Sequence, residues 1–144
     1  MVTDDFVGFW KLVSAEFWWT TGESADLYGP DAAGLLIYSP RGQMSVQIMR
    51  RQRPAFVADD ARRGSAEEIK AAFEGYLSYY GSYTVDEAAG TVTHHMRASL
   101  FPNWVGQDLT RYYEFAGKRL TLRTPPITMA SQQFTGVLVW ERDG

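Results

Sequence analysis

Three side chains that can carry acid–base or anion-binding chemistry, Glu16, His94 and Arg111, stand in stretches where apolar and polar residues alternate. In an extended strand successive side chains point to opposite faces, so a charged residue that must face water indicates which neighbours point inward. With Lys11 facing water, Glu16 points inward, and with Glu114 facing water, Arg111 points inward. Polar residues at alternate positions around His94 turn its imidazole inward as well.

The set of Glu16, His94 and Arg111 has two interpretations that the residues leave open. Buried charges are costly unless they are paired, so an inward Glu and an inward Arg should meet, and that pair can be purely structural. In the functional interpretation Arg111 binds a carboxylate, enolate or phenolate of a ligand. Glu16 or His94 then serves as general acid or base, because burial can bring either pKa toward neutrality. A single inward histidine is more often a hydrogen-bonded core residue than a catalyst.

The same alternation predicts the side chains that surround a ligand. They are mostly aromatic or aliphatic, as is usual in apolar pockets: Trp18, Tyr38, Met44, Ile48, Tyr83, Tyr113 and Phe134. Trp104 falls in residues 101–106, which interrupt a strand, and there it either stacks on a ligand at the mouth or packs a corner. If the alternation is inverted, Gln47 lines the interior as a neutral hydrogen bonder, and His95 replaces His94 there. A β-bulge or a shift of register reverses every assignment beyond it, so both versions stay open.

The chain offers few groups to metals or cofactors. It has no cysteine, and its two histidines, His94 and His95, are adjacent. Adjacent strand residues point to opposite faces, so the two cannot chelate one ion in regular structure. The sequence contains no Walker loop, Gly-x-Gly-x-x-Gly, Gly-x-Ser-x-Gly or His-Glu-x-x-His motif. We expect no metal site and no cofactor.

Eight stretches have the alternation or composition of β-strands: about residues 8–20, 34–39, 43–50, 81–85, 91–100, 107–115, 119–124 and 132–142. Evenly spaced strands with short turns indicate a sandwich or a barrel. About eight antiparallel strands close into a barrel just wide enough for one small ligand, and closure removes exposed strand edges. We therefore predict an all-β, eight-stranded antiparallel barrel over residues 1–144, with a β-sandwich as the alternative.

One helix should interrupt the strands between the third and the fourth of these stretches. Ser65-Ala66-Glu67-Glu68 has the form of a capping box, in which a Ser hydroxyl and a Glu carboxylate satisfy free backbone N–H groups. Apolar residues at helical spacing follow, so an amphipathic helix is expected over about residues 66–79. Its apolar stripe caps the barrel opening or lies against the outer wall.

Composition narrows the partners. The 144 residues suit one domain, and the net charge of −3 comes with no basic stripe, so we expect no nucleic-acid partner. The first residues are acidic and lead into no apolar secretion segment, and no run approaches the roughly 18 apolar residues of a membrane span. We expect a cytoplasmic protein and leave a homodimer open.

Several stretches resemble the bacterial and fungal family of lipocalin-like domains. Gly8-Phe9-Trp10 resembles the Gly-x-Trp signature of the lipocalin superfamily, and Arg142 falls where that superfamily has an Arg lying across the Trp. A guanidinium over an indole is a cation–π contact of about 0.5–2 kcal/mol. Further matching stretches are Tyr28-Gly29-Pro30-Asp31, Gly34-Leu35-Leu36-Ile37-Tyr38, Met44-Ser45-Val46-Gln47, Phe73-Glu74-Gly75-Tyr76, Thr93-His94-His95, Ser99-Leu100-Phe101-Pro102-Asn103-Trp104, residues 120–126 and residues 136–142.

The resemblance implies a barrel that binds a hydrophobic small molecule, and some barrels of this shape act as cyclases or isomerases. We expect a cofactor-independent barrel that encloses a small apolar or aromatic molecule and transforms it by cyclisation or isomerisation. Holding a flexible substrate in a reactive conformer can itself remove several kcal/mol of barrier. The alternatives are a carrier without turnover, which needs no acid–base pair, and an interaction protein.

Overall fold

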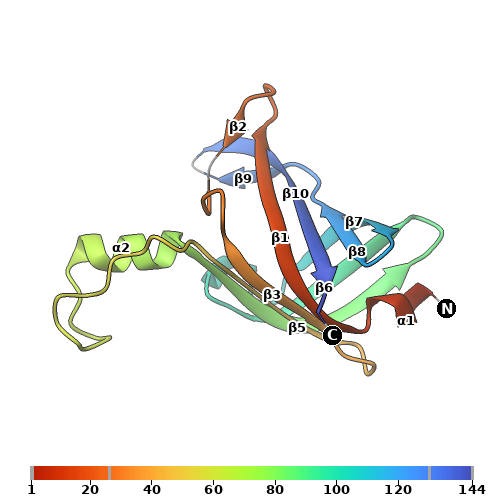
Figure 1. Ribbon diagram of the computed structural model, residues 1–144, viewed down its shortest axis with the longest axis horizontal. Coiled ribbons are helices and arrows are strands. Elements are labelled where there is room, and N and C mark those ends of the chain that lie inside the picture. The colour runs from red at the N-terminus through yellow and green to blue at the C-terminus, as the bar shows by residue number, and fades with distance from the viewer. Residues whose placement is uncertain (1, 26, 130, 144) are drawn as a thin grey trace.

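The strands form one closed antiparallel barrel in the computed structural model, which describes residues 2–25, 27–129 and 131–143 (Figure 1). Within these residues eight long strands follow one another around the barrel, and the first also pairs with the last, which closes it. The long strands are β1 (Gly8–Trp19), β3 (Ala33–Tyr38), β4 (Gln43–Met49), β5 (Tyr76–Asp86), β6 (Thr91–Ser99), β7 (Asp108–Ala116), β8 (Arg119–Arg123) and β10 (Gln132–Arg142). The prediction of an eight-stranded barrel is confirmed, and the sandwich alternative is wrong.

Two short strands lengthen one end of the barrel. β2 (Ser24–Ala25) pairs with the end of β1, and β9 (Ile127–Met129) pairs with the start of β10.

The hairpin between β3 and β4 shows how the local sequence makes a turn. The Ser39 hydroxyl accepts the Gln43 N–H at 3.0 Å, and Gly42 takes a φ of 83°, a conformation that glycine adopts without a steric penalty.

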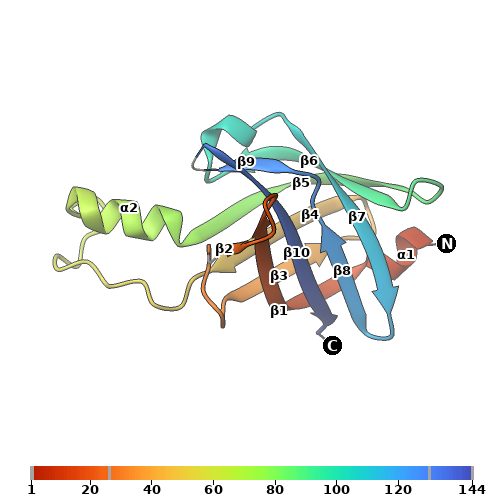
Figure 2. The same cartoon turned by 90° about the horizontal axis from the view of Figure 1, so that it is seen from above.

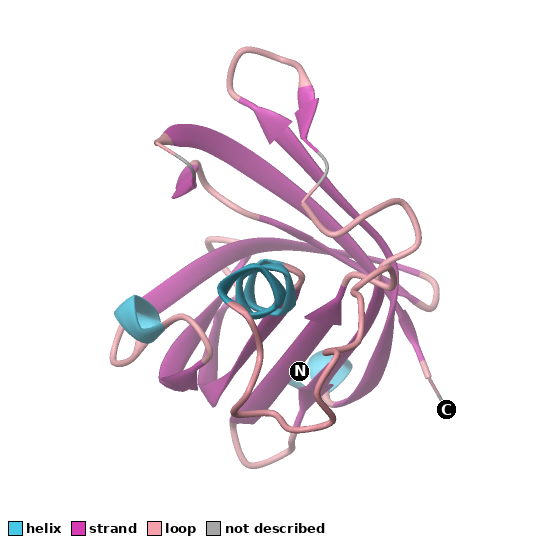
Figure 3. Ribbon diagram, turned by 90° about the vertical axis from the view of Figure 1, so that its left-hand side faces the viewer, coloured by secondary structure: helices cyan, strands magenta, loops and turns pink. Residues whose placement is uncertain are grey.

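The inserted helix, α2 (Ala66–Glu74), lies between the third and fourth long strands, as predicted, which are β4 and β5. Its capping box is present: the Glu68 N–H donates to the Ser65 hydroxyl at 3.2 Å, and the Ser65 N–H donates to the Glu68 carboxylate at 2.8 Å. Figures 1 and 2 show that α2 projects from the barrel, and Figure 3 shows it in front of the opening.

The predicted end of this helix, near residue 79, is wrong. The helix stops at Gly75, and β5 begins at Tyr76, so that residues 76–82 pair with β4 from Met49 back to Gln43. The aromatic residues of this stretch satisfy the helical spacing and the strand alternation alike. Pairing with a distant strand decides between the two, because aromatic residues pack well on a pleated surface.

The other end of the barrel is plugged by α1 (Val2–Phe6). The Phe6 ring is fully buried, with edge-on contacts to Tyr38, Tyr113 and Phe115 at centroid distances of 4.9 to 5.3 Å. The Trp10 indole N–H donates to the Phe6 carbonyl at 2.8 Å.

Arg142 seals this end from outside. Its guanidinium lies 4.3 Å from the Trp10 ring centroid and donates to the carbonyls of Val7 and Asp5 at 2.7 and 2.6 Å. The arginine lying across the Trp, which the Gly-x-Trp resemblance implied, is therefore present.

A bulge in β1 reverses the alternation on which the position of Glu16 depends. The pairing of β1 with β10 shifts between Leu12 and Ser14, so one extra residue enters β1 there. Before the shift Leu12 points inward, but after it Phe17 takes the buried place, with Glu16 and Trp18 exposed. The predictions that Glu16 and Trp18 point inward are wrong for this reason.

The helices were expected to include no membrane span. Across the described residues, no helix combines the length and the apolar composition that crossing a bilayer requires. The cytoplasmic location stays a prediction.

Candidate functional site

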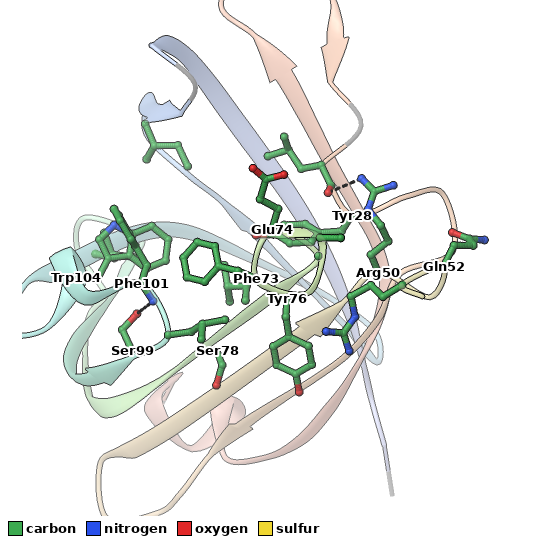
Figure 4. A pocket seen from close by; sticks show the side chains of 18 of the residues that line it. Tyr28, Arg50, Gln52, Phe73, Glu74, Tyr76, Ser78, Ser99, Phe101 and Trp104 are labelled. Atoms are coloured by element: carbon green, nitrogen blue, oxygen red, sulfur yellow. Dashed lines mark hydrogen bonds between the residues drawn. The ribbon is translucent and has the colours of Figure 1, made fainter. Parts of the chain in front are cut away.

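A cavity of about 930 Å³ opens at the end of the barrel opposite α1. Its walls come from α2, the start of β5, the 3-10 turn η1 (Pro102–Trp104) and the segment around Tyr28. Figure 4 shows the rings of Phe73, Phe101 and Trp104 on one side, with Arg50 and Gln52 on the other. Ligand sites commonly measure about 300–1,000 Å³ and are lined largely by apolar groups. We call this space the mouth cavity.

A smaller space, the inner pocket, lies deeper in the barrel and adjoins the mouth cavity. The two share the lining residues Tyr28, Leu77, Trp104 and Ile127. The inner pocket measures about 40 Å³, and a water-sized group needs roughly 10–15 Å³ on this measure, so it admits about three non-hydrogen atoms. Its lining residues include hydrogen-bonding groups from four separate strands: Tyr79 on β5, His94 on β6, Arg111 on β7 and Trp140 on β10.

His94 is held from both sides by phenols. Its side chain is 2% exposed, with Nε2 lying 2.6 Å from the Tyr38 hydroxyl and Nδ1 lying 2.7 Å from the Tyr79 hydroxyl. Burial, followed by the positive charge of Arg111, lowers the pKa of His94 well below its usual value. A neutral imidazole has one N–H and one acceptor nitrogen, so one tyrosine donates to it and the other accepts from it.

His95 and Gln47 lie on the outer face, so the inverted alternation is wrong. His95 contacts Asp108 through Nδ1 at 2.8 Å and Thr84 through Nε2 at 2.9 Å. The Gln47 side chain accepts the Tyr76 hydroxyl at 2.9 Å. In the part of the chain that the structure describes, no group of three or more His, Asp or Glu side chains could hold a metal ion.

Arg111 points inward as predicted, but without the expected carboxylate. It is 8% exposed, its Nη1 donates to the Thr110 carbonyl at 3.2 Å, and its guanidinium also hydrogen-bonds the Tyr79 hydroxyl. Burial raises the pKa of Tyr79, and the neighbouring guanidinium partly opposes that rise. Glu16 faces water, so its pairing with Arg111 is wrong, and the ion pairs among the described residues do not include Arg111.

Trp140 brings to the inner pocket a buried donor that has no partner among the described residues. Its side chain is 1% exposed, and its Nε1 has no hydrogen-bond partner among the residues described. Sequence alternation places Trp140 on the inward face, but it gives no sign that the indole N–H is unsatisfied.

Tyr79 is a residue of the inner pocket that the sequence analysis does not predict, because the expected helix extends to residue 79. The signal is present, since Tyr79, Gly81 and Tyr83 follow the strand alternation.

The structure divides the predicted ligand-binding residues into two groups. Ile48 and Trp104 line the inner pocket, and Trp104 lines the mouth cavity too. The others pack elsewhere: Tyr38, Met44, Tyr83 and Tyr113 fill the closed half, and Phe134 stacks on Trp19 with centroids 4.1 Å apart. The expected hollow therefore occupies only the open half, because α1 and the rings around it fill the rest.

Fold and site together define a closed antiparallel barrel with a large, mostly apolar cavity at its open end and, beneath it, a small pocket in which a few hydrogen-bonding groups stand among apolar side chains. The chain belongs to the lipocalin-like domain family, whose sequence pattern it matches over residues 7–143. One relative is the Aspergillus oryzae protein named 4'-hydroxy-3'-methoxypropiophenone carrier protein ppsC. It is 31% identical over 106 residues, which cover 69% of this chain and 96% of that protein.

Proposed function

We propose that this chain binds and carries a small, largely aromatic molecule in the mouth cavity, without a cofactor. The observation that carries the proposal is the cavity of about 930 Å³, walled by Phe73, Phe101 and Trp104 and adjoining the inner pocket. Stacked and edge-on aromatic contacts favour an aromatic ligand over an aliphatic one of equal size. The similar A. oryzae protein is named as the carrier of an aryl ketone, which supports the same class of ligand here.

Carriage is favoured over turnover by the state of the titratable groups. Both nitrogens of His94 are engaged by tyrosines, and Glu16 lies outside the barrel, so neither of the expected acid–base groups is free to exchange a proton with the ligand. A general acid or base must come within hydrogen-bond reach of the proton that it transfers. A carrier requires no such group.

Cyclisation or isomerisation is the second candidate, and Tyr79 is the observation that favours it. Its hydroxyl reaches the inner pocket and joins Arg111 to His94, so it can donate a proton to a ligand oxygen while the neighbouring groups rearrange their hydrogen bonds. In this case His94 and Arg111 keep the catalytic roles expected for them, and Glu16 has none.

Binding is tested by titrating the protein with 4'-hydroxy-3'-methoxypropiophenone and following tryptophan fluorescence. Trp104 lines the cavity, so ligand should change the emission of the wild type and change it less in Trp104→Phe. Trp18→Phe is the matched control, because Trp18 faces outward and its variant should respond like the wild type. Equal responses of all three proteins, or no response by any, would contradict the proposal.

Turnover is tested on the same mixtures by chromatography and mass measurement of the recovered ligand. Carriage predicts that the ligand returns unchanged after long incubation with a molar excess of protein. A new product that forms with the wild type and fails to form with Tyr79→Phe, at equal ligand occupancy, would establish the second candidate instead.

A further inference from the structure

The inner pocket contains a buried cation for which the described residues provide no counter-ion. Arg111 is 8% exposed and hydrogen-bonds only neutral oxygen atoms, those of Thr110 and Tyr79. Burying an unpaired charge is costly, and proteins offset that cost with an opposite charge or with a ligand. The structure thus leaves one strong anion-binding group unused at the bottom of the ligand cavity.

We propose that the inner pocket receives an anionic oxygen group of the ligand, a carboxylate or a phenolate, held by the Arg111 guanidinium, the Trp140 indole N–H and the Tyr79 hydroxyl. This inference rests on the proposed function and adds the chemical class and orientation of the ligand. The anionic end enters first, and the aromatic body stays in the mouth cavity.

The charges around the two spaces favour an anion. Among the described residues that line them, Arg50, Arg53 and Arg111 are cationic, and Glu74 is the single acid. The whole chain has a net charge of −3, so this concentration of positive charge is local. A cationic ligand group in the inner pocket would meet Arg111 at close range, and the described residues that line this pocket include no acid to offset it.

The unsatisfied donors favour an acceptor oxygen. An indole N–H and a guanidinium can only donate hydrogen bonds, so another donor cannot satisfy the buried Nε1 of Trp140. Arg111 also has more N–H groups than Thr110 and Tyr79 can accept. A carboxylate accepts several hydrogen bonds at once, and charge-assisted bonds from an arginine are among the strongest in proteins.

The size of the inner pocket determines which part of the ligand enters it. Room for about three non-hydrogen atoms accommodates a carboxylate and excludes a benzene ring. The ring then lies in the adjoining mouth cavity, against Trp104, which lines both spaces. The inferred ligand is therefore an aromatic acid with its carboxylate on a short arm, or an acidic phenol whose ionised oxygen alone enters the inner pocket.

The test compares two ligands of the same shape, 3-phenylpropanoate and 3-phenylpropanamide, by calorimetric titration at pH 7. The carboxylate should bind the wild type at least about 10-fold more tightly than the amide. Arg111→Met should weaken carboxylate binding about 10- to 100-fold and change amide binding by less than about 3-fold, because a charge-assisted bond contributes more than a neutral one. Arg119→Met is the matched control, since Arg119 pairs with Glu141 on the outer surface.

Two further measurements keep the inference testable if Arg111→Met does not fold. Trp140→Phe retains a ring and should weaken carboxylate binding about 2- to 10-fold through loss of one donor. For the wild type, carboxylate affinity should fall as the pH drops below the pKa of the ligand. A phenol without a carboxyl group should instead gain affinity as the pH rises through its own pKa, and this separates the two anion sources.

Equal affinity of the wild type for the acid and the amide would overturn the inference and leave the proposed function standing. The inference would also be overturned, and the proposed function left standing, if Arg111→Met lowered the affinities for the acid and for the amide by the same factor. Failure of the acid, the amide and the aryl ketone to bind at all would overturn the proposed function and the inference together.

Discussion

The Tyr38 hydroxyl lies 2.6 Å from Nε2 of His94, and this contact marks the boundary between the filled and the hollow half of the barrel. On the filled side, the Tyr38 ring packs edge-on against Phe6 and Tyr83 with centroids 5.3 and 4.6 Å away. On the hollow side, His94 and Tyr79 line the inner pocket. The floor of the ligand site is therefore a hydrogen-bonded layer resting on aromatic packing.

Removal of the Tyr38 hydroxyl should destabilise this floor. Tyr38→Phe leaves Nε2 of His94 buried without its partner, which costs about 1–3 kcal/mol in the free energy of unfolding. Urea denaturation measures the change. Tyr80→Phe, at a position 56% exposed, should stay within about 0.5 kcal/mol of the wild type, and equal losses in the two variants would refute the assignment.

The stability of the protein should depend on pH through His94. Its pKa is lowered by burial in the folded state, whereas the unfolded chain has the ordinary value near 6.5. The free energy of unfolding is therefore undiminished by His94 above about pH 6.5, where the imidazole is neutral in both states. It decreases as the pH falls from there toward the folded-state pKa, by about 1.4 kcal/mol per pH unit, because only the unfolded state then takes up the proton.

The variant His94→Gln should show a shallower loss of stability over this range than the wild type. His95→Gln is the control, since His95 lies on the outer face and its loss should leave the contribution of His94 in place. Parallel stability curves for the wild type and His94→Gln would show that His94 takes up its proton equally in both states.

Gly81 is required where β5 and β6 approach closely. A Cβ at this position would lie 1.8 Å from the His95 carbonyl oxygen, which is backbone and cannot rotate away. We expect Gly81→Ala to lower the free energy of unfolding by about 3 kcal/mol or more, since the strands must separate. Gly90→Ala meets open space at a positive φ and should cost only about 1–2 kcal/mol. Comparable losses in the two variants would contradict the prediction, because they would mean that β5 and β6 accommodate a Cβ at position 81.

Arg142 should stabilise the closed end without affecting the ligand site. Arg142→Met removes the cation–π contact to Trp10 and the two hydrogen bonds to backbone carbonyls, with an expected cost of about 2–4 kcal/mol. Thermal and urea unfolding should show this loss, while ligand affinity under native conditions stays within about 2-fold. A large drop in the ligand affinity of fully folded Arg142→Met would contradict this prediction, because it would show that the closed end influences the mouth cavity.

Phe73 should contribute to binding and little to stability. The side chain is 43% exposed on α2, whose described residues include no buried one, yet it lines the mouth cavity. Phe73→Ala should lower the affinity for an aromatic ligand about 2- to 10-fold, the magnitude of one aromatic contact, and should leave the free energy of unfolding nearly unchanged. Ile69→Ala, one turn earlier and 51% exposed, is the matched control and should bind like the wild type. Equal affinities of the two variants would argue that α2 does not touch the ligand.

Predictions from alternation succeeded where a strand is regular and failed where it is not. The inward orientation of His94 and Arg111 follows from neighbours one to three residues away, and both side chains are buried. Glu16 is misplaced by one extra residue in β1, inserted where that strand pairs with β10 more than a hundred positions later. A bulge leaves no clear local signal here, because Val13 and Ser14 fit a regular strand equally well.

From the amino-acid order alone came the eight-stranded barrel and the inward Arg111, because strand alternation, turn residues and capping groups act over a few neighbours. The contact between Trp10 and Arg142 was implied by the family resemblance. The tertiary structure decided where the hollow lies and what lines it. Phe6 fills the closed half only once α1 docks among rings from β3 and β7, and Tyr79 reaches the inner pocket only once β5 pairs with β4. Such contacts join distant segments, so packing across the barrel, rather than any local pattern, determines them.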